Sequence, residues 1–264
     1  MTKHPSKKTA LFVSPHLDDA VFSCGGTMAK MAAEGWRTIL CTVFTKSVTN
    51  PQGFALQCQL DKNLGPEVDY MKLRRVEDAA AARILNVSKT VHLNFPEAPH
   101  RGYEFAPELF AGVKSGDEVW KNIAEQLALL DEIHEPEIVF APQGLGNHCD
   151  HLQTIDAVLE SCKHEKIYWY YDTPYVIHQP EAQKYRRLSQ LLEQKSQNIS
   201  SFLKIKIEAC AAYSSQINFQ FGGHIKLKKM LTKFHFQSNK RSEVGEIVEN
   251  FLTEILKTRD DLTL

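Results

Sequence analysis

Short apolar runs alternate with longer amphipathic segments along the first two thirds of the chain. The runs are rich in β-branched and aromatic residues and end at polar or turn residues, which is typical of strands. They cover residues 10–14, 37–44, 90–95, 137–142 and 166–171. Apolar positions at helical spacing predict helices over 20–35, 70–87, 117–134 and 148–162. This alternation predicts an α/β fold, a Rossmann-like three-layer α/β/α arrangement with a mostly parallel sheet.

The rest of the chain has a less regular pattern. Residues 178–199 are polar and Gln-rich, which favours an exposed insertion, whereas apolar spacing predicts helices over 200–219 and 243–256. Two segments that contain several Pro and Gly residues, 45–69 and 96–116, are long enough to frame a binding site as loops.

Length and composition narrow the class of protein. The 264 residues can bury one large core, and we expect a single domain over 1–264. Its core spans about 8–175, and a helical, substrate-framing part spans about 176–264. A formal net charge of −1 gives no attraction to nucleic acid, so no such partner is expected. Without a signal-like or membrane-spanning apolar run, and with six scattered cysteines, we expect a cytoplasmic protein with reduced thiols and no membrane span.

Two adjacent carboxylates follow the first predicted strand. The stretch SPHLDDAVFSCGG begins at residue 14 and places His16, Asp18 and Asp19 between this strand and the next helix. In open parallel sheets, ligands bind beyond the carboxyl ends of the strands. A plainer interpretation is that the aspartates only cap the helix and interact with its dipole.

A second polar stretch follows the strand predicted at 137–142. Here APQGLGNHCDHLQT carries His148, Asp150 and His151 directly after a glycine-bearing turn. If His148 opens a helix, it lies on roughly the same face as His151, three residues later, while Cys149 points elsewhere. A lone histidine in such a place is often only packed or hydrogen-bonded. Two such stretches at one edge of the sheet favour a metal site.

The residue types at this edge match a catalytic zinc site, which takes three protein ligands and leaves a position for water. Adjacent aspartates cannot both face one ion in the same way. The natural division makes one of Asp18 and Asp19 a ligand and the other the base that takes a proton from water. Binding of the ion also removes the repulsion between the two carboxylates.

The two stretches together resemble the zinc-dependent N-deacetylases of the LmbE-like/PIG-L family. The family pattern His-Pro-Asp-Asp-Glu reads His16-Leu17-Asp18-Asp19-Ala20 here, and its His-x-Asp-His motif reads His148-Cys149-Asp150-His151. Weaker similarity covers RRVEDAAAARILNV (74–87), YYDTP (170–174) and KIEACAAYSSQI (206–217). The resemblance therefore covers most of the chain, although only the two metal motifs are specific.

The resemblance implies a ligand set and a base. The ligands of Zn²⁺, or of another divalent metal such as Fe²⁺, would be His16, Asp19 and His151. Asp18 would be the general base that acts on water. Leu17 in place of Pro changes the stiffness of the loop without removing a ligand, and Ala20 in place of Glu removes a contact near the site.

The resemblance also implies roles for three other side chains. His148 would polarise the amide oxygen or stabilise the oxyanion. Asp150 would orient one of the two histidines of its motif. Arg74 stands where the family contacts substrate, although a salt bridge on the surface of its own helix, with Glu77 or Asp78, explains it equally well.

The implied activity is removal of the acetyl group from an N-acetylated amino sugar or its conjugate, a small-molecule substrate. Family members often form homo-oligomers, so the resemblance also implies self-association. The alternatives are a zinc amidase that cleaves a larger amide and a metal-binding module without turnover. A nucleotide-binding protein is disfavoured because the first strand–helix turn lacks Gly-x-Gly-x-x-Gly. The basic segment 224–241 either holds an anionic group or surface, or is a solvated face.

Overall fold

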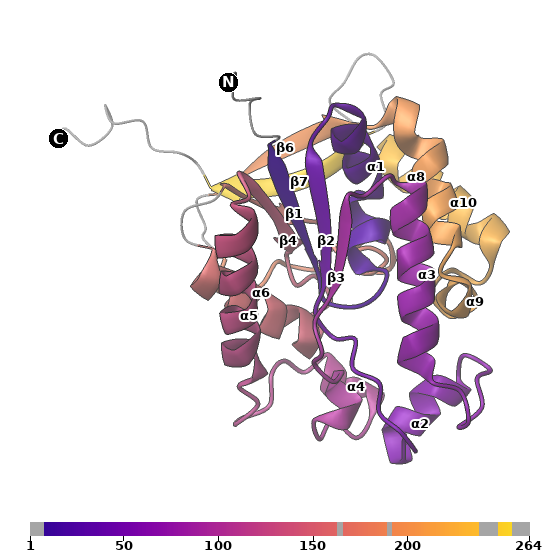
Figure 1. Cartoon of the computed structure of the whole chain (residues 1–264). Helices are drawn as coiled ribbons and strands as arrows, with labels where there is room; N and C mark the ends of the chain where they lie inside the picture. Colours follow the sequence, from indigo (N-terminus) through magenta and orange to yellow (C-terminus); the bar gives the residue numbers. More distant parts are fainter. Residues whose placement is uncertain (1–7, 163–165, 189–191, 238–247, 255–264) are drawn as a thin grey trace.

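One seven-stranded sheet forms the centre of the computed structural model, which describes residues 8–162, 166–188, 192–237 and 248–254. The strand order is β3-β2-β1-β4-β5-β7-β6 (Figure 1). The strands are β1 (Thr9–Ser14), β2 (Arg37–Thr42), β3 (Lys89–His92), β4 (Ile138–Pro142), β5 (Lys166–Tyr170), β6 (Leu192–Asn198) and β7 (Val248–Glu254). β1 to β5 are parallel, and β7 runs antiparallel to both β5 and β6. The five predicted strands are therefore confirmed.

Helices cover both faces of the sheet, which confirms the three-layer α/β/α fold (Figure 1). One face carries α1 (Asp19–Ala33), α3 (Tyr70–Ile84), α8 (Leu203–Ala211), α9 (Ser214–Phe221) and α10 (His224–Gln237). The other carries α5 (Val119–His134) and α6 (Cys149–Ser161). Shorter helices lie in the connections: α2 (Gly53–Leu60), η1 (Ala98–His100), α4 (Ala106–Leu109), α7 (Tyr175–His178) and η2 (Ser200–Phe202).

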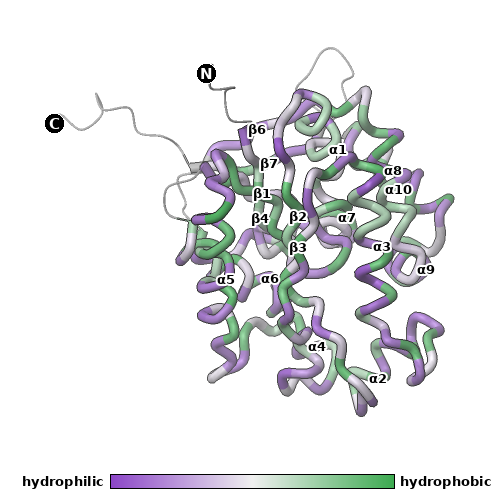
Figure 2. The backbone as a smooth tube through the Cα atoms, viewed as in Figure 1, coloured by the Kyte–Doolittle hydropathy of each residue, from purple (hydrophilic) through white to green (hydrophobic). Residues whose placement is uncertain are grey.

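Alternate side chains of β1 enter two separate hydrophobic clusters. Phe12 packs on the α1 face, where its ring stacks on Phe140 at 4.4 Å, while Leu11 and Val13 pack under α5 and α6. A parallel strand covered on both faces needs apolar residues at every position, which explains the unbroken apolar run. Each large side chain buried in this way contributes about 1.5–3 kcal/mol. Figure 2 shows the complementary pattern on α5, whose hydrophobic and hydrophilic positions alternate along the helix.

The last third of the chain departs from the prediction in three places. The helix predicted over 243–256 is wrong, because Val248–Glu254 forms β7 inside the sheet. The segment 178–199, predicted as an exposed insertion, contains a strand of the sheet, because Leu192–Asn198 pairs with β7 along its whole length. The helix predicted over 200–219 is divided into η2, α8 and α9, and α9 ends at Gly222, whose φ of 71° suits glycine.

The first helix, α1, is kinked at Cys24, which has φ −133° and ψ 26°. The buried Lys206 ammonium donates to the carbonyl of Ser23 at 3.1 Å, just before the kink. The Glu249 carboxylate accepts from the amides of Gly26 and the next residue, at 3.0 and 2.7 Å. Lys206 and Glu249 lie 2.6 Å apart. One buried ion pair thus satisfies backbone groups on both sides of the kink.

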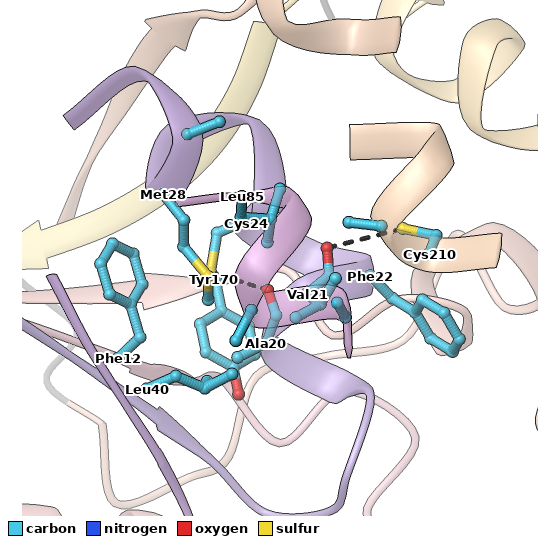
Figure 3. Packing of buried hydrophobic residues seen from close by; sticks show 14 of the residues in the cluster. Phe12, Ala20, Val21, Phe22, Cys24, Met28, Leu40, Leu85, Tyr170 and Cys210 are labelled. Atoms are coloured by element: carbon cyan, nitrogen blue, oxygen red, sulfur yellow. Dashed lines mark hydrogen bonds between the residues drawn. The ribbon is translucent and has the colours of Figure 1, made fainter. Parts of the chain in front are cut away.

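Two thiol groups donate to carbonyls at the start of α1, one from within the helix and one from α8. Figure 3 shows Cys24 donating to the carbonyl of Ala20 and Cys210 of α8 donating to the carbonyl of Val21. The sulfur–oxygen distances are 3.0 and 3.7 Å. No disulfide joins the six cysteines, all of which lie in the described part of the chain.

The basic segment forms α10 over its described residues, and residues 238–241 lie outside the described part. Leu227 and Leu231 are buried under the helix. The lysines on its outer side are exposed: Lys226, Lys228, Lys229 and Lys233. Exposed lysines are compatible with a solvated face and with a surface that binds an anionic group, so both interpretations stay predictions. Among the described helices, none is long and apolar enough to span a membrane.

Candidate active site and metal centre

The two polar stretches meet where β1 and β4 lie side by side. The helix after β1 packs on one face of the sheet and the helix after β4 packs on the other. Such a reversal is the topological switch point at which α/β proteins bind ligands. The fold thus brings His16 and Asp150, 134 residues apart in sequence, within 2.9 Å of each other.

The three residues expected to bind metal present their ligand atoms to one another. His16 Nδ1 lies 3.1 Å from Asp19 Oδ2, and His151 Nε2 lies 3.2 Å from the same oxygen. A tetrahedral ion with ordinary zinc bonds would separate its ligand atoms by roughly 3.3 Å. His151 Nε2 is also buried without a hydrogen-bond partner among the described residues. Spacing, donor types and the burial of His151 Nε2, whose contact with Asp19 does not form a regular hydrogen bond, all fit a divalent ion.

Each of the two imidazoles has a carboxylate on its second nitrogen. His151 Nδ1 lies 2.6 Å from Asp172 Oδ1, and His16 Nε2 lies 2.9 Å from Asp150 Oδ2. When these nitrogens donate their protons, the lone pairs of His16 Nδ1 and His151 Nε2 face Asp19. Sequence reasoning missed Asp172, although it lies in the quoted stretch YYDTP. It follows β5 at the same edge of the sheet, and that position was the available signal.

The structure corrects the partner expected for Asp150. Its carboxylate contacts His16, not the side chains of His148 or His151, because it extends from the first turn of α6 toward the loop after β1. The Arg101 guanidinium, 2.8 Å from Oδ1, and the amide of Ala98, 3.1 Å from Oδ2, hold it there. These contacts occupy the carboxylate, which disfavours the alternative ligand group of His16, His148 and Asp150.

Asp18 and Asp19 face different partners although they are adjacent. Asp18 has φ 155° and ψ −36°, outside the regions that most residues occupy, and Asp19 then begins α1. The Asp18 carboxylate lies 3.4 Å from the Arg74 guanidinium. Burial raises the pKa of Asp18 to about 7, against the opposing effect of Arg74. Asp18 is therefore a buried carboxylate of the site that is not part of the ligand triad.

Arg74 is buried beside Asp18 and does not lie on a surface. Its Nη1 donates to Glu97 at 2.6 Å, and its Nε is buried without a hydrogen-bond partner in the described ranges. The alternative of a surface salt bridge with Glu77 or Asp78 is wrong. Glu77 instead accepts from the first turn of α9, and Asp78 accepts from the hydroxyl of Tyr213 at 2.6 Å.

His148 is the N-cap of α6, and its Nδ1 accepts from the amide of Asp150 at 3.2 Å. The ring proton therefore lies on Nε2. Burial, with the charge of His16 as the next cause, lowers the pKa of His148 to about 3. As predicted, Cys149 points elsewhere and packs against Ala98 and Tyr103.

A cavity of about 200 Å³ opens above these groups. Both segments predicted to frame the site line it, although each contains a short helix: Phe54 and Cys58 come from the first, and Glu97 and Phe110 from the second. α9 adds Phe219. The volume is below the 300–1,000 Å³ usual for ligand pockets. A larger substrate would therefore place only one end inside.

Two positions of the His16 stretch carry apolar residues. Leu17 and Ala20 are both fully buried, and neither places a polar group in the cavity. Leu17 and Ala20, which stand where the family pattern has Pro and Glu, therefore leave the triad of His16, Asp19 and His151 in place.

A family model matches the part of the chain that contains the candidate site. The model described as PIG-L, GlcNAc-PI de-N-acetylase, matches residues 11–162. That span contains both polar stretches and the three candidate ligands. The chain belongs to this family.

Individual relatives of this PIG-L protein are similar over most of its length. The 2'-N-acetylparomamine deacetylase of Streptomyces fradiae is 30% identical over 211 residues, which cover 78% of this chain and 72% of that protein. A structure described as the zinc-inhibited form of teicoplanin deacetylase Orf2 has 25% identity and a TM-score of 0.77, covering 93% of this chain and 97% of that chain. The A40926 pseudoaglycone deacetylase Dbv21 shares the fold, with a TM-score of 0.80 and 23% identity over 94% of this chain and 97% of that chain.

Proposed function

We propose that this chain is a metal-dependent hydrolase that removes the acetyl group from an N-acetylated amino sugar or its conjugate. One observation carries the proposal: His16 Nδ1, Asp19 Oδ2 and His151 Nε2 lie within 4.8 Å of one another, and His16 and Asp19 line a cavity that Asp18 and His148 also line. Membership of the PIG-L family supports the reaction type, and the name of the Streptomyces relative supports an acetylated amino sugar.

We assign the ion to the triad of two imidazoles and one carboxylate, a donor set typical of catalytic zinc. When bound there, a divalent ion lowers the pKa of water and polarises a carbonyl oxygen. Zinc is the ion we propose, with Fe²⁺ as the alternative. One solved relative is described as zinc-inhibited, so loading experiments should compare several ions at equimolar amounts.

Asp18 is the proposed general base. Its carboxylate lies in the cavity, outside the triad, and Arg74 holds it at 3.4 Å. In the proposed reaction, Asp18 takes a proton from the attacking water and later gives it to the amine nitrogen as the bond to the acetyl carbon breaks. Acetic acid and a free amine are the products, and the acid then ionises to acetate while its proton goes to the amine to form an ammonium, so atoms and charges balance.

His148 is the proposed stabiliser of the amide oxygen. Because Nδ1 accepts from the amide of Asp150, the ring presents Nε2–H as a donor. A neutral imidazole of this kind donates a hydrogen bond to a carbonyl oxygen as negative charge develops there. We also propose that Arg74, which lines the cavity, contacts substrate in addition to holding Asp18.

The test is parallel measurement of acetate and amine from N-acetylglucosamine glycosides and N-acetylated aminoglycoside fragments, with protein loaded with Zn²⁺, Fe²⁺, Co²⁺ or Mn²⁺. We expect acetate and amine in equal amounts. Amine without acetate would identify cleavage of a larger amide, and stoichiometric ion binding without either product would identify a binding module.

Variants of the two adjacent aspartates test the division of roles. Asp18→Asn should keep its ion and lose activity by roughly 10²–10⁴-fold, because only the base is removed. Asp19→Ala should lose the ion itself. If Asp18→Asn loses the ion as completely as Asp19→Ala does, the two carboxylates are assigned in the wrong order.

A further inference from the structure

Lys62 lies on the wall of the active-site cavity and has no role in the reaction described above. It follows α2 directly, and it lines the same cavity as Asp18 and His148. Its ammonium donates to the carbonyl of Cys58, one turn earlier, at 2.7 Å. This bond uses one of the three N–H groups and turns the side chain back along the helix end.

Two aromatic rings from other elements hold the Lys62 ammonium in place. It lies 4.5 Å from the centre of the Phe219 ring on α9 and 5.6 Å from the Tyr70 ring at the start of α3. In such cation–π contacts the negative faces of the rings attract the ammonium and restrain its position. A long flexible side chain is thereby fixed where a substrate would meet it, and its ordering entropy is lost before binding.

The carboxylates around Lys62 are engaged elsewhere. Glu97 and Asp18 face the Arg74 guanidinium at 2.6 and 3.4 Å, and Asp61 accepts from Gln57 at 2.6 Å. Within the described ranges, Lys62 forms no ion pair with any carboxylate. Burial, and then the nearby Arg74 charge, lower the pKa of Lys62. The Lys62 ammonium thus has no carboxylate partner of its own among the described residues.

We propose that Lys62 binds an anionic substituent, a carboxylate or a phosphate, of the N-acetylated amino sugar, and so determines substrate choice. This inference rests on the proposed deacetylase function and adds a substrate class to it. Two ammonium N–H groups remain for the anion, and the apolar rings of Phe219 and Tyr70 limit competition from water.

The experiment compares three substrates that differ only at carbon 6 of the sugar: methyl N-acetylglucosaminide, its 6-carboxylate (the uronate) and its 6-phosphate. The wild type should process at least one anionic member with kcat/KM roughly tenfold or more above the neutral member, because only the anionic members accept a charge-assisted hydrogen bond from the ammonium. The anionic member that shows the preference identifies the carboxylate or the phosphate as the ligand.

Three variants locate the preference. In Lys62→Met the ratio of anionic to neutral kcat/KM should fall to about one, whereas Lys62→Arg, which keeps the charge, should keep most of the preference. Lys72→Met, an exposed lysine outside the cavity, is the matched control and should keep the wild-type ratio. Each ratio is taken within one variant, so partial loss of folded protein cancels.

The possible failures are distinguishable. If the wild type hydrolyses the neutral and anionic substrates equally, or if Lys62→Met keeps the preference, the inference about Lys62 is wrong while the proposed function stands. If none of the three sugars, and no other N-acetylated amino sugar, releases acetate with any ion, the proposed function itself fails.

Discussion

Asp172→Asn tests how the protein prepares His151 to bind an ion. Asp172 is buried, and its Oδ1 lies 2.6 Å from His151 Nδ1. Its Oδ2 accepts from the amides of Gln143 and Leu145, at 2.9 and 3.2 Å. Asparagine has a single acceptor oxygen, which the two backbone amides should hold. Its NH₂ group then faces His151 Nδ1, so that nitrogen must accept and the ring proton moves to Nε2.

The expected effect is on ion affinity. A proton on His151 Nε2 removes the lone pair that faces Asp19. To restore the lone pair on His151 Nε2, the asparagine would have to turn its amide nitrogen toward the backbone N–H groups of Gln143 and Leu145. Those two donors would then lack an acceptor, and each unsatisfied buried donor costs about 1–3 kcal/mol. Changes to such outer partners lower metal affinity by about 10–100-fold, which corresponds to roughly 1.4–2.7 kcal/mol.

The assay is competition for Zn²⁺ against a chromophoric chelator at fixed pH. Asp156→Asn is the matched control, because Asp156 lies on the same helix as His151 but pairs with Arg187. The control should bind within about threefold of the wild type. If Asp172→Asn also binds that tightly, with unchanged circular dichroism and melting, the tautomer argument is refuted.

Three further perturbations test the framework around the site. Lys206→Met leaves the buried Glu249 carboxylate without its ammonium partner, and urea unfolding should show a loss of about 3–5 kcal/mol; a loss below about 1 kcal/mol would mean that the pair is not needed at the kink. Gly26→Ala places a Cβ 2.7 Å from the Ile199 side chain and should cost about 1–3 kcal/mol in the same assay, whereas wild-type stability would show that the contact relaxes freely. Removing bound ion with EDTA should lower Tm, and adding the ion back should restore Tm. At an ion concentration of 100 times Kd, binding should add about 2.7 kcal/mol to the free energy of unfolding. A Tm that does not change with the ion would contradict a site formed only in the folded state.

The parallel part of the sheet could be predicted because its central strands β1, β2 and β4 are buried along nearly their whole length, and the half-buried strands β3 and β5 still carry short runs of β-branched and aromatic residues. Such strands read as continuous apolar runs, and the five runs correspond to β1 to β5. β6 gave no such signal, because an edge strand composed of LEQKSQN needs no apolar face. β7 was mistaken for a helix because one of its buried positions holds Glu249, whose partner Lys206 lies 43 residues earlier. A charge neutralised at that distance is invisible to local periodicity.

The candidate ligands could be predicted because they are packed into two short stretches at strand ends. Their supporting carboxylates could be predicted only in part. Asp150 was found, but its partner His16 depends on how two loops face each other across β1 and β4. Asp172 and Arg101 lie in neither stretch, and only tertiary structure shows that they hold His151 and Asp150. Lys62 had no motif, and its significance comes from the charges that surround it.

The most direct measurement is an anomalous difference map from crystals of the metal-loaded protein, recorded on both sides of the absorption edge of the ion. The account predicts one peak per chain, within bonding distance of His16 Nδ1, Asp19 Oδ2 and His151 Nε2, with Asp18 outside bonding distance. A peak bound elsewhere, or the absence of any peak at saturating ion, would contradict it.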